Sequence, residues 1–199
     1  MILTKWTTAY KLTAQDGTTH EGRCRWVKGK ANPHGVKRGA GGLCSAGFYH
    51  GYHIPELAGF LNPIHANIPN PRLWEVQIRG TVEEDRGILK IGATEMRLVR
   101  ELPYVEPTTD QRIAFAISCG GVILSLRQQA IPAWDHWAAE WLAGRGTEAE
   151  RCAAAAAAAA RAAAYAAAAA DAADAAYARD IIQDAVAFAL TYDRPSGEP

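Results

Sequence analysis

The chain has 199 residues, and its 21 Lys and Arg side chains are matched by 21 Asp and Glu side chains. This length is enough for one domain and an extension, each with its own buried apolar surface. Because the formal net charge is zero, no whole-protein field draws the chain to nucleic acid or to a membrane surface.

The N-terminal apolar run is too short for a signal peptide, and no later stretch has the length and hydrophobicity of a membrane span. We therefore expect a cytoplasmic protein without membrane contact, and nucleic acid is not an expected partner. The four cysteines include no C-x-x-C pair, so we expect reduced thiols, mostly buried, and no disulfide framework. They are Cys24, Cys44, Cys119 and Cys152.

The first predicted element is an extended strand. Four of its residues alternate along one face: Trp6, Thr8, Tyr10 and Leu12. The letters "QDG" at 15–17 supply turn chemistry, so we predict a hairpin that returns through "RCRWV".

A Gly-rich stretch, "KGKANPHGVKRGAGGL", comes next. It is long for a connection inside a compact domain, which favours a functional loop. Its basic side chains could meet phosphates or an acidic partner surface. They are Lys28, Lys30, Lys37 and Arg38. A solvated surface loop is the alternative, and the stretch lacks the spacing of a nucleotide-binding glycine motif.

The middle of the chain predicts one helix and several strands. "CSAGFYHG" is typical of a short strand, and "IPELAGFL" of a short helix with Pro55 in its first turn. "LWEVQIRG" alternates apolar and polar residues, and "GILKIG" and "EMRLVREL" are two further predicted strands. Together these patterns indicate a twisted sheet with few helices.

Helices are predicted from Thr108 to Leu142. Trp134, Trp137 and Trp141 follow at helical spacing, which places three large rings on one face. This face either binds a partner or packs against the protein's own elements, since so much aromatic area is costly to leave in water.

From Thr147 to Tyr192 alanine dominates and neither Gly nor Pro interrupts the sequence. Alanine has the highest helix propensity, so a long continuous helix is predicted. Small side chains allow close packing with another helix, and apolar residues recur near the end of the run. A homodimer through this C-terminal helix is therefore a hypothesis.

The sequence as a whole predicts an α+β protein, with a twisted, mostly antiparallel sheet followed by helices and a long Ala-rich C-terminal helix. The expected divisions are a mixed α+β domain over 1–104, a helical segment over 105–146, a helical arm over 147–192 and a disordered tail over 193–199.

Several motifs of the first half carry a resemblance: "AYKLTAQDG", the Cys24 and Cys44 pair, "GFYHGYHIPELAGF", "LWEVQIRG" and "RLVRELP". Together they resemble a domain of unknown function found mainly in phage and prophage proteins, and the Ala-rich tail resembles extensions on such proteins. The resemblance implies a phage-type origin and a location in the host cell cytoplasm. On this basis we expect an accessory protein that binds a host or viral protein, without catalysis or cofactor.

The order of the Gly-rich loop, "GFYHGYHIPELAGF", "LWEVQIRG" and "TVEEDRG" is also similar to that of the small ADP-ribosyltransferases that modify antibiotics. That similarity implies that His20 holds the nicotinamide ribose of NAD and that Tyr49 stacks on the nicotinamide ring. Glu84 or Asp85 would orient the acceptor or stabilise positive charge as the glycosidic bond breaks. Each of these residues also has a purely structural alternative. His20 could be a polar strand residue, Tyr49 could pack in the core, and "EEDRG" could form an acidic hairpin turn.

Zinc is the remaining alternative for the first half of the chain. Residue types that bind zinc occur at six positions: Cys24, His34, Cys44, His50, His53 and His65. Structural zinc sites usually draw their ligands in close pairs from tight turns, and only His50 and His53 form such a pair. No metal site is therefore expected, and Cys44 is expected to be unreactive.

Overall fold

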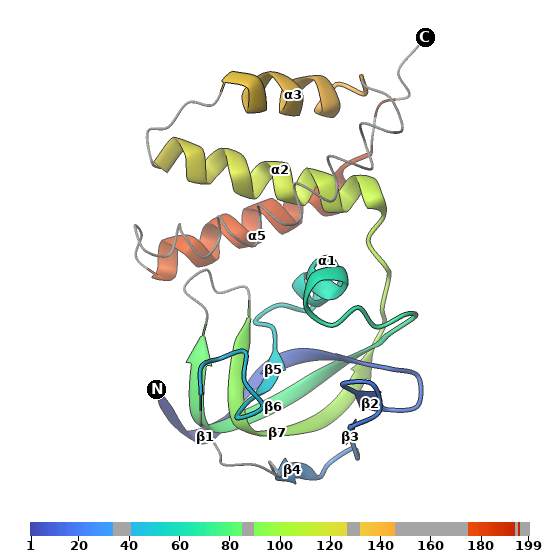
Figure 1. Cartoon of the computed structure of the whole chain (residues 1–199), viewed down its shortest axis with the longest axis vertical. Coiled ribbons are helices and arrows are strands. Elements are labelled where there is room, and N and C mark those ends of the chain that lie inside the picture. Colours follow the sequence, from blue (N-terminus) through green and yellow to red (C-terminus); the bar gives the residue numbers. More distant parts are fainter. Residues whose placement is uncertain (34–40, 85–89, 127–131, 146–174, 194, 196–199) are drawn as a thin grey trace. The chain divides into compact units, whose positions relative to one another are not determined.

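The N-terminal part of the chain is built on an antiparallel sheet (Figure 1). The computed structural model describes residues 1–33, 41–84, 90–126, 132–145, 175–193 and 195. These residues belong to two compact units, Met1–Glu106 and Pro107–Pro199. A sheet in the first unit and helices in the second confirm the α+β class.

The main sheet has the strand order β1-β6-β7-β4, and β5 also pairs with β7. Its strands are β1 (Ile2–Thr13), β4 (Ala31–Pro33), β5 (Tyr49–Gly51), β6 (Arg72–Glu84) and β7 (Ile91–Leu102). All of these pairs are antiparallel. The long strands β6 and β7 form the centre of the sheet, with β1 beside β6.

The predicted hairpin between β1 and "RCRWV" is wrong. The chain does turn at Gly17, but β1 pairs along its length with β6. The residues after the turn form a separate small hairpin of β2 (Thr18–Thr19) and β3 (Cys24–Arg25). Each strand of this hairpin has only two residues, so it cannot pair along the length of β1. β6 is long enough to do so.

The end of "GILKIG" and all of "EMRLVREL" belong to one strand, β7, while residues 87–89 lie outside the described residues. One of the two irregularities in its pairing with β6 lies on β6, since Arg79 pairs with Glu95 while Val82 pairs with Ala93. One extra residue on β6 is absorbed there by Gly80, whose φ is 87°. A second shift, where Glu75 pairs with Arg100 but Val76 with Leu98, leaves Val99 as an extra residue on β7. β7 nevertheless runs as one strand from Ile91 to Leu102.

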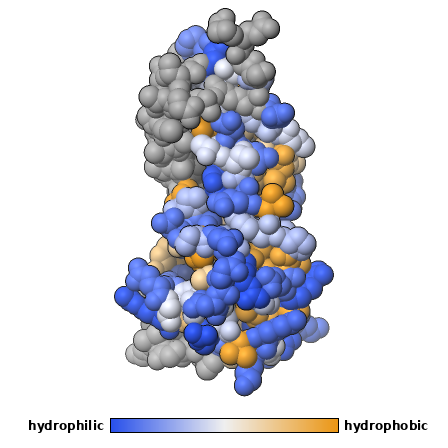
Figure 2. All heavy atoms as spheres, turned by 90° about the vertical axis from the view of Figure 1, so that its right-hand side faces the viewer, coloured by the Kyte–Doolittle hydropathy of each residue, from blue (hydrophilic) through white to orange (hydrophobic). Residues whose placement is uncertain are grey.

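The first unit buries apolar residues on both faces of the sheet, since Leu12 and Leu73 point away from the face of Ala9 and are also buried. Its core cluster is Ala9, Trp26, Trp74, Val76, Ile78, Val82, Ile91, Ala93, Met96 and Leu98. Helix α1 (Pro55–His65) contacts β1 and β6, and it begins with Pro55 in its first turn as predicted. Hydrophilic residues cover much of the face of this unit that Figure 2 shows.

The second unit contains α2 (Thr109–Leu126), α3 (Pro132–Leu142) and α5 (Ala175–Thr191). Helix α2 packs against α5. No helix in the described part of the chain is long and apolar enough to cross a membrane. Most of the predicted Ala-rich helix, from 147 to 174, lies outside the described residues, as does most of the predicted tail.

Helix α5 buries one face, which combines apolar residues with alanines. Ile182 and Val186 are buried together with Ala185 and Ala189, whereas Leu190 is 44% exposed. Small alanines at these positions let the helix approach its neighbour closely. The described part of the arm therefore buries one face within its own unit.

Candidate functional site

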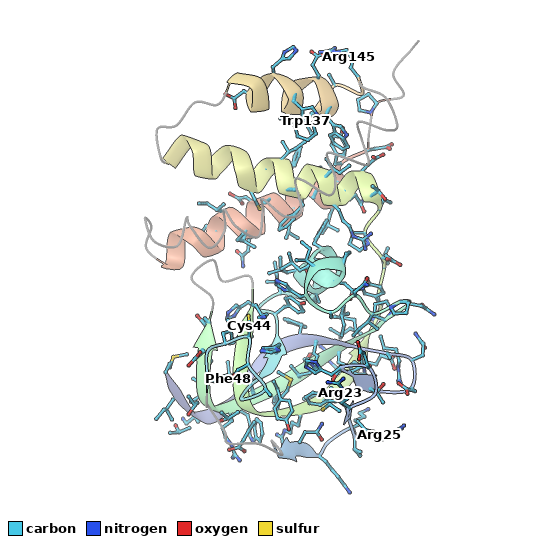
Figure 3. All side chains as sticks on the ribbon, in the orientation of Figure 1. Arg23, Arg25, Cys44, Phe48, Trp137 and Arg145 are labelled. Atoms are coloured by element: carbon cyan, nitrogen blue, oxygen red, sulfur yellow. The ribbon has the colours of Figure 1, made fainter. Side chains whose placement is uncertain are left out.

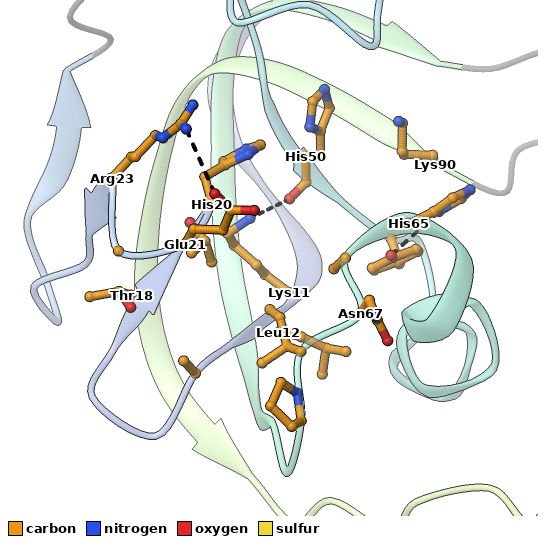
Figure 4. A pocket seen from close by; sticks show the side chains of 17 residues that line it. Lys11, Leu12, Thr18, His20, Glu21, Arg23, His50, His65, Asn67 and Lys90 are labelled. Carbon is orange, nitrogen blue, oxygen red and sulfur yellow. Dashed lines mark hydrogen bonds and ion pairs between the residues drawn. The ribbon is translucent and has the colours of Figure 1, made fainter.

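A cavity of about 500 Å³ opens in the first unit between β1, the β2–β3 hairpin, β5 and the end of α1 (Figure 4). This volume lies within the range of small-molecule sites. We call it the Lys11 cavity. Six of its lining residues are basic or imidazole side chains: Lys11, His20, Arg23, His50, His65 and Lys90. Among the described lining residues Glu21 is the one acid, and its exposed carboxylate pairs with Arg23 at 3.6 Å.

Lys11 occupies an unusual position for a lysine. Ala9, Lys11 and Thr13 share the inward face of β1, and Lys11 is only 8% exposed. Its Nζ donates a hydrogen bond of 2.8 Å to the backbone oxygen of His50. The same atom lies 4.9 Å from the ring centroid of Trp26, so the ring face supports the charge.

Burial lowers the pKa of Lys11 to about 8, and the nearby Cys24 opposes this shift. The described residues form no ion pair with Lys11, although a buried charge usually has one. An ammonium has three N–H donors, of which the His50 carbonyl takes one. Lys11 therefore retains the capacity to bind an anion in the cavity.

His20 reaches the cavity from the turn of the small hairpin. His20, Glu21 and Gly22 all have positive φ angles, of 53°, 55° and 84°. Left-handed conformations are uncommon for residues other than glycine, and they concentrate at functional sites. Burial, followed by the charges of Lys11 and Arg23, lowers the pKa of His20. Its ring lies 6.5 Å from that of His50.

Of the other two imidazoles, His50 has a tautomer fixed by its hydrogen-bond partner. His50 Nε2 faces the backbone oxygen of Leu43, which only accepts, so Nε2 carries the proton and Nδ1 has a lone pair. His65 stacks on Tyr52, whose hydroxyl lies 3.4 Å from His65 Nδ1. Burial lowers the pKa of each imidazole to about 4, with Lys90 as a smaller cause in both. Both rings are therefore neutral at pH 7.

We expect the free energy of unfolding to fall as the pH drops from 6.5 towards 4. The folded pKa of His50 and of His65 is about 4 against 6.5 in the unfolded chain, so the unfolded state binds more protons in this window. After allowance for solvent screening, His50 contributes about 2 kcal/mol. Urea unfolding at pH 7, 6 and 5 measures the slope, since carboxylates stay mostly ionised there.

A matched variant identifies the source of this slope. His50→Gln keeps an N–H donor near the position of Nε2, for the Leu43 oxygen, but cannot titrate. We expect this variant to reduce by about half the slope of the free energy of unfolding against pH. An unchanged slope in both His50→Gln and His65→Asn would contradict the assignment to these imidazoles.

The structure does not bring the predicted NAD-handling residues together. His20 lines the Lys11 cavity, but Tyr49 and Glu84 do not. Tyr49 packs edge-on against Trp26, with ring centroids 5.2 Å apart, beside the core cluster. Glu84 Oε1 lies 3.3 Å from His53 Nε2. Asp85 lies outside the described residues.

The predicted partner-binding residues fall in both units. Lys28 and Lys30 are exposed, while Lys37 and Arg38 lie outside the described residues. Trp141 on α3 is 2% exposed and stacks on Tyr192 at 5.4 Å. The ring of Trp141 thus packs within its own unit. Trp137 on α3 is half-buried (Figure 3), and the side chain of Trp134 lies outside the described residues.

The three described cysteines are free thiols, and only Cys119 is buried, so the expectation of mostly buried cysteines is wrong. Burial raises the pKa of Cys119 to about 12. Cys44 is exposed (Figure 3) and accepts a hydrogen bond of 3.1 Å from Lys90 Nζ. Cys152 lies outside the described residues. Within the described part of the chain, no three Cys, His, Asp or Glu side chains gather to hold a metal ion.

Comparison of the chain with family models, curated proteins and solved structures finds no match. The resemblances to a phage domain and to ADP-ribosyltransferases therefore stay predictions.

Sequence reasoning missed Lys11 as a site residue. The signal that could have found it is a lysine on the face of β1 that Ala9 and Thr13 share, opposite the face that carries Tyr10 and Leu12. His65 was considered only as a metal ligand. Its place at the end of α1 brings it to the cavity, beside Tyr52 from the segment after β5.

Proposed function

We propose that this chain is an accessory protein that acts by binding, and that its first unit binds a small anionic ligand in the Lys11 cavity. The observation that carries this proposal is the lining, in which basic and imidazole side chains surround a buried ammonium. Glu21, the acid of the described lining, is paired with Arg23 and exposed.

The physical chemistry of the cavity favours anions over neutral ligands. Lys11, Arg23 and Lys90 supply cationic donors, and charge-assisted hydrogen bonds are stronger than those between neutral groups. Burial at Lys11 reduces solvent screening, which strengthens its attraction for an anion. A bound anion also replaces the missing counter-charge of this ammonium.

The predicted host or viral protein partner would bind elsewhere, because the Lys11 cavity has the volume of a small-molecule site. Lys28 and Lys30, which are exposed, stay the predicted contacts of the first unit for such a partner. The phage-type origin and the homodimer through the C-terminal helix stay hypotheses.

Isothermal titration calorimetry tests the proposal with citrate, inorganic phosphate, ADP and NAD as anionic probes and spermidine as a cationic one. We expect at least one anion to bind saturably, and Lys11→Met to weaken it about tenfold or more through loss of the buried cation. Lys28→Met is the matched control, since Lys28 is exposed and outside the cavity, and should change affinity less than about twofold. Equal effects of the two variants, or preference for spermidine, would contradict the proposal.

The calorimetric titration with NAD also tests the alternative function, that of an ADP-ribosyltransferase. The feature that supports it is His20, which lines the cavity. Tyr49 packs on Trp26, so NAD bound in the Lys11 cavity should depend on Lys11 rather than on Tyr49. NAD binding that is lost in Tyr49→Phe and Glu84→Gln but kept in Lys11→Met would favour the transferase site instead.

A further inference from the structure

We propose that Lys11 captures its ligand covalently, as an imine with the carbonyl group of a small anionic aldehyde or ketone such as a 2-oxo acid. This inference rests on the proposed anion binding in the Lys11 cavity and goes further, because it names the class of ligand and the bond that forms.

The first argument is the placement of the amine. Lys11 lines the cavity, and the hydrogen bond of 2.8 Å from its Nζ to the His50 carbonyl fixes the position of the amine (Figure 4). A neutral amine can make this bond with one N–H and still present its lone pair to the cavity. The Trp26 ring, 4.9 Å from Nζ, restricts the amine from a second side.

The second argument is the environment of the amine. Lysine acts as a nucleophile when desolvation or a neighbouring cation favours its neutral form. Lys11 is 8% exposed, and Arg23 and Lys90 line the same cavity. The described residues provide it with no carboxylate partner that would hold it as an ammonium, and its pKa of about 8 agrees with this geometry.

The third argument is the presence of groups that move protons. His20 and His50 line the cavity with ring centroids 6.5 Å apart, and Nδ1 of His50 carries a lone pair. A neutral imidazole can accept a proton from the attacking amine, so both rings are candidate general bases. Arg23 and Lys90 would hold the carboxylate of the ligand by charge-assisted hydrogen bonds.

The step balances without an oxidant or reductant. The Nζ lone pair attacks the carbonyl carbon, and the oxygen takes up a proton to become a hydroxyl. The nitrogen loses one proton, the hydroxyl takes up a proton and leaves as water, and the C=N bond of an iminium ion forms. The iminium nitrogen then loses its second proton to give the imine. The amine and the carbonyl compound therefore give the imine and one water, and hydrolysis reverses the reaction.

Reductive trapping of the native protein tests the inference. Pyruvate or glyoxylate is added with sodium cyanoborohydride, whose hydride reduces an imine to a stable secondary amine, and peptide mass spectrometry locates the adduct. We expect Lys11 to be modified at least about tenfold faster than Lys28 or Lys30, which are exposed. Lys11→Arg should abolish this preferential adduct while it keeps the positive charge.

Two controls separate this inference from the anion-binding proposal. Lactate has the charge of pyruvate but no keto group, and propionaldehyde has an aldehyde group but no charge. Binding of lactate and pyruvate without preferential labelling of Lys11 would overturn the imine and leave anion binding intact. Preferential labelling by propionaldehyde alone would support a reactive amine but contradict the anionic ligand class.

Discussion

Trp26→Ala is expected to destabilise the first unit by about 4 kcal/mol, in the range found for large-to-small substitutions of buried aromatic residues. Trp26 is 6% exposed and belongs to the core cluster, and its ring packs edge-on against Tyr49. Its Nε1 donates a buried hydrogen bond of 2.9 Å to Thr19 Oγ1. Urea unfolding at pH 7 measures the loss.

Thr19→Val separates the hydrogen bond from the packing. It keeps the shape of the side chain and removes the acceptor of Trp26 Nε1–H, which should cost about 1–2 kcal/mol. A loss in Trp26→Ala no larger than that in Thr19→Val would contradict the role of the ring in the core. Anion binding should also weaken in Trp26→Ala, because the variant admits water beside Lys11.

Gly80→Ala is expected to destabilise the same unit by about 3 kcal/mol. Gly80 has a φ of 87°, which strains any residue with a side chain. An added Cβ would also collide with Thr94 Oγ1. That oxygen accepts a hydrogen bond of 3.0 Å from the Thr81 amide, so its displacement breaks a contact at the bulge.

Gly29→Ala is the matched control for the collision. Gly29 has a similar φ of 76°, but a Cβ added there meets no atom within 4 Å. Gly29→Ala should therefore lower the free energy of unfolding by about 1 kcal/mol, which is the cost of the backbone strain alone. Equal losses in thermal or urea unfolding for the two variants would contradict the steric role of Thr94.

The parts of the fold that were predicted correctly rest on local signals. Pro55 followed by an apolar helical pattern marked the start of α1, and the alternation of Trp74, Val76 and Ile78 marked β6. The errors concern pairing over long separations. Which strand covers β1 depends on the length of the competing partners and on the left-handed turn at 20–22, and neither is visible in a local pattern.

The site was harder to predict than the fold because its residues come from separate elements. His20 and His50 were noted for their type, but their approach to Lys11 depends on the small hairpin and on the pairing of β5 with β7. Tyr49 illustrates the converse. Its aromatic type suggested a stacking role, whereas its neighbour across the fold, Trp26, makes it part of the packing around the core.

The most direct test of the anion-binding cavity is the titration of Lys11 itself. Two-dimensional NMR of the protein with ¹³C-labelled lysine side chains reports it, and Lys11→Met assigns the signal. We predict a pKa of about 8 in the free protein, and a higher value with citrate bound, since an anion favours the ammonium. Titration of Lys11 in the range typical of exposed lysines, or a titration that citrate and the other anions leave unchanged, would contradict the proposed site.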